Sequence, residues 1–75
     1  MDKKQIVEQN TQILNDFDLE FSVHNNGYHY IVSHHNYTIN FYPSTGKWYD
    51  SITERRGKGM QSFLEYIGKT EPENI

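Results

Sequence analysis

Residues 18–42 constrain the fold more than any other stretch, because apolar and polar side chains alternate there in three runs separated by two turn signals. Alternation with a period of two is typical of strands that bury one face. Asn26-Gly27 is the strongest kind of short hairpin signal, since both residues tolerate a positive φ. His35-Asn36 is the second candidate turn. The expected strands are Asp18–His24, Tyr28–Ser33 and Tyr37–Tyr42.

The two turns also predict how the three strands pair. A turn at Asn26-Gly27 places Val23 opposite Tyr30, and a turn at His35-Asn36 places Val32 opposite Ile39. Both turns gather the apolar residues on the same face, which favours an antiparallel meander. That face holds Leu19, Phe21, Val23, Tyr30, Val32, Ile39 and Phe41. The opposite face is polar except for Ile31 and is expected to meet solvent; it holds Glu20, Ser22, His24, His29, Ile31, Ser33, Thr38, Asn40 and Tyr42.

An amphipathic helix is expected on each side of these strands. Asp2 can cap a helix over Lys3–Asp16, whose apolar residues recur at helical spacing. A second helix follows Gly59, and Gly68 fits the left-handed position that ends a helix. Because both apolar stripes can cover one sheet face, the sequence predicts a two-layer α+β fold of order α-β-β-β-α, with a three-stranded antiparallel sheet and both helices on one face.

The segment between the third strand and the second helix gives weaker signals. Pro43 ends the strand, because proline cannot donate a hydrogen bond to a neighbouring strand. Residues 44–46 have turn chemistry. Lys47–Ser51 fits either a short fourth strand or an extended loop, with Trp48 against the core. Glu54–Gly59 is predicted to be a loop.

The length of 75 residues indicates one small domain over residues 1–75, with an ordered core of about 3–68 and a frayed tail over 69–75. The chain has no cysteine, which excludes disulfides, thiolate zinc sites and a cysteine nucleophile. No apolar run reaches the length of a bilayer span, and the polar N-terminus is unlike a signal peptide. These features predict a cytoplasmic protein with no membrane partner.

The basic residues are concentrated in one part of an acidic chain. The formal net charge is −3, whereas residues 46–59 carry four cations and two carboxylates, a local balance of +2. Gly57-Lys58-Gly59 opens the second helix, where free amides and the helix dipole favour an anion. The alternative is a solvated basic loop whose glycines serve a turn. The candidate phosphate-binding residues are Lys47, Arg55, Arg56, Gly57, Lys58 and Gly59.

The histidines and carboxylates give no catalytic pattern. His24 is expected to face His29 on the polar sheet face, with Tyr42 beside them. No carboxylate is well placed there except Glu20, so no metal and no cofactor are predicted. No Ser-His-Asp spacing or carboxylate pair indicates catalysis. Thr45-Gly46-Lys47 lacks the upstream glycine and the following Ser or Thr of a phosphate-binding loop. The sequence therefore predicts a protein that is not an enzyme.

The predicted order of elements resembles the double-stranded-RNA-binding domain over residues 3–68. In that family a lysine-rich cluster at the start of the second helix contacts phosphates across a groove, and Arg55–Gly59 occupies the matching place. The family's Gly-Pro-x-His hairpin loop and Lys-Lys-x-Ala-Lys helix start are absent. The resemblance implies phosphate contacts from the basic loop.

A second resemblance covers Phe41–Trp48, Arg56–Gly59 and Phe63–Ile67. These segments are similar to small uncharacterised phage and prophage proteins with an FYPxTGxW…RGxG signature. That group implies no activity, but it does imply a phage context in a bacterial host, where small proteins often act on host or defence machinery.

Two functions follow as hypotheses. The first is a small non-enzymatic nucleic-acid-binding module that uses the basic loop. The alternative is a phage-type inhibitor that binds a host or defence protein, in the manner of anti-CRISPR or anti-restriction factors. Such an inhibitor would use either the polar sheet face or the acidic surface of the chain. The partner-binding residues on the polar sheet face are His29, Ile31, Asn40 and Tyr42.

Overall fold

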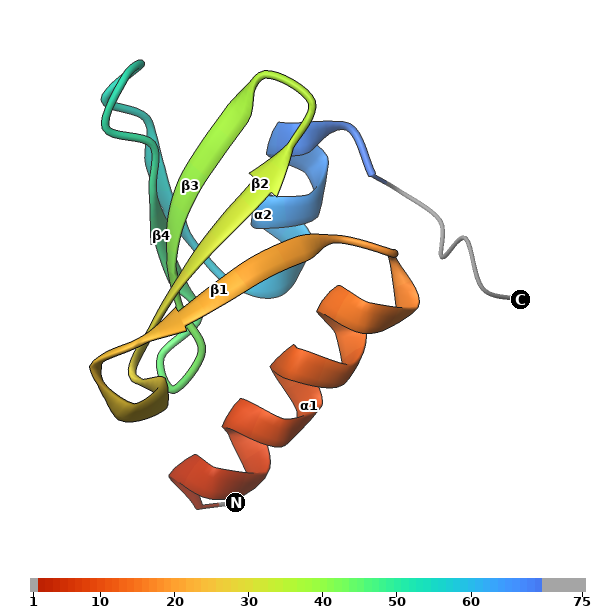
Figure 1. Cartoon of the computed structure of the whole chain (residues 1–75), viewed down its shortest axis with the longest axis vertical. Coiled ribbons are helices and arrows are strands. Elements are labelled where there is room, and N and C mark those ends of the chain that lie inside the picture. Colours follow the sequence, from red (N-terminus) through yellow and green to blue (C-terminus); the bar gives the residue numbers. More distant parts are fainter. Residues whose placement is uncertain (1, 70–75) are drawn as a thin grey trace.

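A computed structural model describes residues 2–69 of the chain. A helix begins the described chain, a sheet follows, and a second helix packs against that sheet (Figure 1). The elements are α1 (Lys3–Asp16), β1 (Glu20–His24), the short 3-10 helix η1 (Asn25–Gly27), β2 (His29–His34), β3 (Tyr37–Tyr42), β4 (Lys47–Tyr49), β5 (Arg56–Lys58) and α2 (Met60–Ile67).

The sheet has five antiparallel strands in the order β1-β2-β3-β4-β5, so each strand pairs with its neighbour in the sequence. The predicted three-stranded sheet is therefore wrong, and so is the topology of the double-stranded-RNA-binding domain. β5 forms inside Glu54–Gly59, where the sequence predicts a loop. Both added strands are three residues long, too short for alternation to distinguish them from a loop. Gly57 at the centre of β5 weakens the signal further.

The pairing of the first three strands is the predicted one. Val23 lies opposite Tyr30 in the β1–β2 pair, and Val32 lies opposite Ile39 in the β2–β3 pair. Each of these pairs places its side chains on the face that the helices cover. The pattern of residues 19–42 therefore predicted the register correctly.

The two turns differ in how well they were predicted. His35-Asn36 joins β2 to β3 as expected, and His35 has a φ of 50°. The β1–β2 connection is longer than the two-residue turn predicted at Asn26-Gly27, because His24 and His29 form the last pair and η1 bridges them. All three residues of η1 have a positive φ, which asparagine and glycine adopt more readily than other residues.

One core joins the inward side chains of the sheet to side chains from both helices. Leu14 of α1 and Phe63 of α2 are fully buried in it, and Phe63 contacts Phe41 at 5.0 Å between ring centroids. Val23, expected in this core, is 57% exposed, because it lies near the turn end of β1, the edge strand. The buried cluster is Leu14, Leu19, Tyr30, Val32, Ile39, Phe41, Trp48, Phe63, Leu64 and Ile67.

The helix boundaries follow from the expected caps. The Gln5 amide donates to the Asp2 carboxylate at 2.9 Å and the Asp2 amide donates to the Gln5 side chain at 3.3 Å, which forms a capping box. Gly68 ends α2 with a left-handed φ of 81°, and the Lys69 amide then donates to the Leu64 carbonyl at 2.9 Å. Both caps were predicted. The rest of the predicted tail, residues 70–75, lies outside the described residues.

Candidate functional site

The sheet face that the helices do not cover, called the outer face below, carries two rows of side chains that cross all five strands. Strand pairing defines each row, because residues directly opposite on neighbouring strands share a face. The first row is His24, His29, Tyr42, Lys47 and Lys58. The second row is Ser22, Ile31, Asn40, Tyr49 and Arg56.

Aromatic rings fill one end of the first row. His24 and His29 lie 5.8 Å apart between ring centroids, as the sequence predicted. The Tyr42 ring stacks on His29 at 5.0 Å and 12°. The Asn40 amide nitrogen donates to the Tyr49 carbonyl at 3.3 Å, so its side-chain oxygen accepts from Nε2 of His29 at 2.8 Å. This bond orients the His29 ring, on which the Tyr42 ring stacks.

Cations fill the other end of both rows. Lys47 lies directly opposite Lys58 across β4 and β5. In the second row, the Arg56 guanidinium carbon lies 5.7 Å from the centroid of the Tyr49 ring, within the range of a cation–π contact. Along β3, β4 and β5, the outward positions that the structure describes hold no carboxylate.

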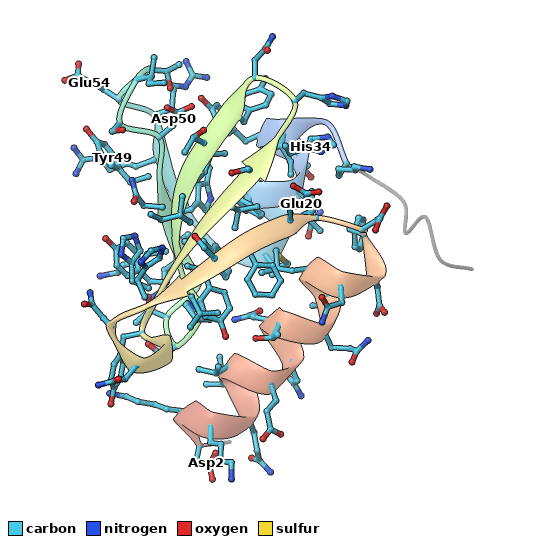
Figure 2. The ribbon with its side chains drawn as sticks, viewed as in Figure 1. Asp2, Glu20, His34, Tyr49, Asp50 and Glu54 are labelled. Carbon is cyan, nitrogen blue, oxygen red and sulfur yellow. The ribbon has the colours of Figure 1, made fainter. Side chains whose placement is uncertain are left out.

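The parts of both rows on β3, β4 and β5 surround an open hollow of about 660 Å³ on the outer face. This hollow is called the basic hollow below. Figure 2 shows Tyr49 on the side of β4 away from α2. Like charges directly opposite each other destabilise a sheet, so the Lys47–Lys58 pair is a feature that folding alone disfavours. The hollow is lined by Tyr42, Lys47, Trp48, Tyr49, Arg56, Gly57 and Lys58.

The tight packing of Trp48 on Gly57 holds β4 against β5. A Cβ atom on Gly57 would lie 2.6–2.8 Å from atoms of the Trp48 indole, so only glycine fits there. The indole N–H donates to the Ser62 hydroxyl of α2 at 3.0 Å, and the Ser62 hydroxyl in turn donates to the Lys58 carbonyl at 2.9 Å. The indole also stacks on Tyr66 at 4.7 Å. These contacts anchor the strands that carry the three cations.

The buried carboxylate of Asp50, which is 3% exposed, organises the loop between β4 and β5. The Tyr66 hydroxyl donates to it at 2.8 Å, and the amides of Ile52 and Thr53 donate to it at 2.9 and 3.2 Å. The Thr53 hydroxyl lies 2.7 Å from the Tyr66 hydroxyl. Figure 2 places Asp50 at the end of β4 and Glu54 out at the loop tip. The loop is therefore tied to α2.

The hydrogen bonds around Asp50 shift the pKa of Asp50 and the pKa of Tyr66. The Tyr66 hydrogen bond, helped by the Ile52 and Thr53 amides, holds the pKa of Asp50 below its ordinary value, although burial opposes this. At Tyr66, the Thr53 contact acts to lower the pKa, but burial and the Asp50 carboxylate outweigh it, so the pKa of Tyr66 is raised. Both shifts indicate an ionised Asp50 that accepts a hydrogen bond from a neutral Tyr66.

The structure brings together only part of the predicted phosphate-binding set. Of that set, Lys47, Arg56, Gly57 and Lys58 line the basic hollow. Arg55 lies outside it, in the loop, where its carbonyl accepts from the Asp50 amide at 2.8 Å. Lys47, Arg56 and Lys58 thus lie on strands β4 and β5, and Lys58 directly precedes Gly59, the N-cap of α2.

The two predicted glycines at that helix start have structural roles in this fold. Gly57 makes room for the Trp48 indole. Gly59 has a φ of 101°, and its amide donates to the Gly46 carbonyl at 2.9 Å. That amide is therefore already used within the protein.

The residues of the predicted protein-binding surface lie on the same outer face. His29 and Tyr42 belong to the first row, and Ile31 and Asn40 belong to the second. This surface and the basic cluster were predicted as separate sites, and Tyr49, which lines the basic hollow, was not among the predicted residues. Successive side chains of a strand point to opposite faces. Because Trp48 was expected to point inward, Tyr49 could have been expected to point outward.

Within residues 2–69, no three His, Asp or Glu side chains are grouped so that they could hold a metal ion. None of the helices in these residues is long and apolar enough to cross a bilayer. No protein-family model matches the chain, and neither the curated proteins nor the solved structures include a significant match.

Proposed function

We propose that this protein is a small non-enzymatic nucleic-acid-binding module whose phosphate contacts come from Lys47, Arg56 and Lys58. The observation that carries the proposal is the meeting of these three cations at one hollow, on strands whose outward positions hold no carboxylate. Phosphate oxygens are the natural partners of such a cluster. Tyrosine rings beside the cations add surfaces on which bases can stack.

The charge distribution supports an oriented and salt-sensitive contact. The chain as a whole is acidic, with a net charge of −3, so its other surfaces repel a phosphate backbone. Each neutralised phosphate releases counterions. Three contacts correspond to a log–log salt slope of about −2.7 on B-form DNA, or about −2.1 on a single strand.

The test is fluorescence anisotropy with labelled DNA and RNA, single- and double-stranded, across a salt series. Lys47→Ala/Lys58→Ala removes two of the three contacts, so the slope is expected to fall to about a third of its wild-type value. The matched control is Lys3→Ala/Lys4→Ala, which removes the same charge from α1. Equal losses in both variants, or no binding of any nucleic acid at low salt, would refute the proposal.

Arg55 sharpens this test, because it is as basic as Arg56 but lies outside the basic hollow. Arg55→Ala is expected to weaken binding less than Arg56→Ala does. A larger effect at Arg55 would move the phosphate contacts from the sheet face to the loop.

A second candidate function is a protein-binding inhibitor of a host or defence factor. The specific observation in its favour is the ordered aromatic and amide surface at His29, Asn40 and Tyr42 in the middle of the outer face, together with the partly exposed Ile31. Tyrosine is enriched in protein interfaces. A pull-down from bacterial lysate that survives nuclease treatment and is lost in Ile31→Arg would favour this candidate over the first.

A further inference from the structure

The two tyrosines of the basic hollow are far enough apart for each ring to stack with a different base. Tyr42 lies opposite Lys47 across β3 and β4, and Tyr49 is two residues further along β4 on the same face. Such diagonal neighbours are about 7–8 Å apart. That is about twice the rise of 3.4 Å between successive nucleotides stacked in a helix. Two adjacent bases on these rings would therefore be unstacked from each other.

Each ring is also held in place before any ligand arrives. The Tyr42 ring, 39% exposed, is stacked on His29, which Asn40 holds by a hydrogen bond of 2.8 Å. The Tyr49 ring has the Arg56 guanidinium over it at 5.7 Å. Side chains that are already ordered lose less conformational entropy on binding. Both rings therefore have contacts within the protein that favour the orientations they adopt here.

We propose that the ligand is single-stranded nucleic acid, bound with two neighbouring bases splayed onto Tyr42 and Tyr49. This inference rests on the proposed nucleic-acid binding and adds the form of the ligand. Lys47 lies beside both rings, as the cross-strand neighbour of Tyr42 and the second residue before Tyr49. Lys58 lies opposite Lys47. The phosphate that joins the two bases therefore binds between these lysines.

A duplex does not fit this arrangement. Its bases are paired and stacked, so they reach the tyrosine rings only if the duplex opens, whereas the bases of single strands can be splayed and stacked on aromatic side chains. Reading a duplex through its major groove requires a helix or a two-stranded ribbon that enters the groove. Here the cations and rings lie on the face of a five-stranded sheet.

The first experiment uses the unmodified protein and four probes of equal length, measured by fluorescence anisotropy. The probes are single-stranded DNA, single-stranded RNA, the matching duplex and an abasic strand with the same phosphates. We expect either or both single strands to bind at least about fivefold more tightly than the abasic strand, because stacking contributes per base. The duplex is expected to bind no better than the abasic strand.

The second experiment identifies the rings. Tyr42→Ala and Tyr49→Ala are each expected to weaken single-strand binding by roughly 5- to 100-fold. Binding of the abasic strand is expected to weaken far less, because Lys47 and Lys58 remain in place. Tyr42→Phe and Tyr49→Phe keep the ring and should bind like the wild type. Tyr28→Ala is the matched control, because Tyr28 is 65% exposed next to the β1–β2 turn and lies outside the basic hollow.

The outcomes separate this inference from the proposed function. Equal affinity for the single strand, the abasic strand and the duplex, lost in Lys47→Ala/Lys58→Ala, would overturn the stacking inference and leave phosphate binding in place. Failure of every probe to bind would overturn both. Because the four-probe comparison needs no variant, it remains decisive even if a tyrosine substitution destabilises the fold.

Discussion

The sheet consists of two regions that are held together in different ways. Strands β1 to β3 are five or six residues long, alternate clearly and are joined by short turns. Strands β4 and β5 are three residues long, and contacts with α2 hold them in place, chiefly through Trp48 and Asp50. The first region is specified locally, whereas the second depends on residues 14 to 16 positions away. The cations of the candidate site all lie in the second region.

The largest effect is expected from Phe41→Ala, because Phe41 is fully buried and joins the two regions. It pairs with Tyr30 on one side and with Trp48 on the other. Removing a buried phenylalanine ring costs about 3–5 kcal/mol, which in a chain of this size approaches the whole free energy of unfolding. Urea denaturation should show both regions unfolding together. Val23→Ala is the control. Val23 lies on the same sheet face as Phe41 but is 57% exposed, so its loss should lower the free energy of unfolding far less.

Gly57→Ala should break the second region alone. The new Cβ would meet the Trp48 indole at 2.6 Å, and overpacking of this kind costs about 1–3 kcal/mol. Hydrogen exchange should rise in β4 and β5 while β1 to β3 stay protected, and Trp48 fluorescence should shift. Adding Trp48→Phe makes room for the methyl group, so the double variant should recover part of the loss. If the Gly57→Ala cost is unchanged in the Trp48→Phe background, the indole is not its cause.

Asp50→Asn tests the link between the loop and α2 through pH. The folded pKa of Asp50 lies below its ordinary value, so ionised Asp50 stabilises the fold above the unfolded pKa of about 3.9, and this contribution is lost as pH falls through the folded pKa. The wild type should therefore melt at a higher Tm than the variant near neutral pH. The gap between their Tm values should close at acidic pH.

The exposed carboxylate of Glu54, in the same loop, provides the control for this titration. Glu54→Gln should leave the pH dependence of Tm close to that of the wild type. A constant Tm difference between wild type and Asp50→Asn at all pH values would contradict the role given to Asp50.

The smallest effect on stability is expected from Lys58→Glu, which should raise the free energy of unfolding slightly. The change replaces a like-charge pair opposite Lys47 with an opposite-charge pair, worth about 0.2–1 kcal/mol in a sheet. The proposed function predicts that the same change weakens nucleic-acid binding, because it puts a carboxylate into the basic hollow. Thermal melting and anisotropy on one sample test both. A variant that is more stable and binds equally well would show that the lysine pair has no role in binding.

The sequence alone determined the parts of the fold that local chemistry specifies. The bounds of α1 and its Asp2 cap, the Gly68 cap and the pairing of Val23 with Tyr30 were all predicted. Each depends on residues close in the chain or on a long alternation, so a short window of sequence contains the whole signal. The three-residue strands β4 and β5 contain too few residues for any such pattern.

Only the tertiary structure decided that β4 and β5 join the sheet. Their pairing depends on the fit of the Trp48 indole over Gly57 and on hydrogen bonds to Ser62 and Tyr66, which are contacts that sequence order does not reveal. The pairing of β4 and β5 also determines the geometry of the candidate site. Because β4 and β5 extend the sheet, the basic cluster and the aromatic surface, which the sequence presents as two separate places, lie side by side on one face.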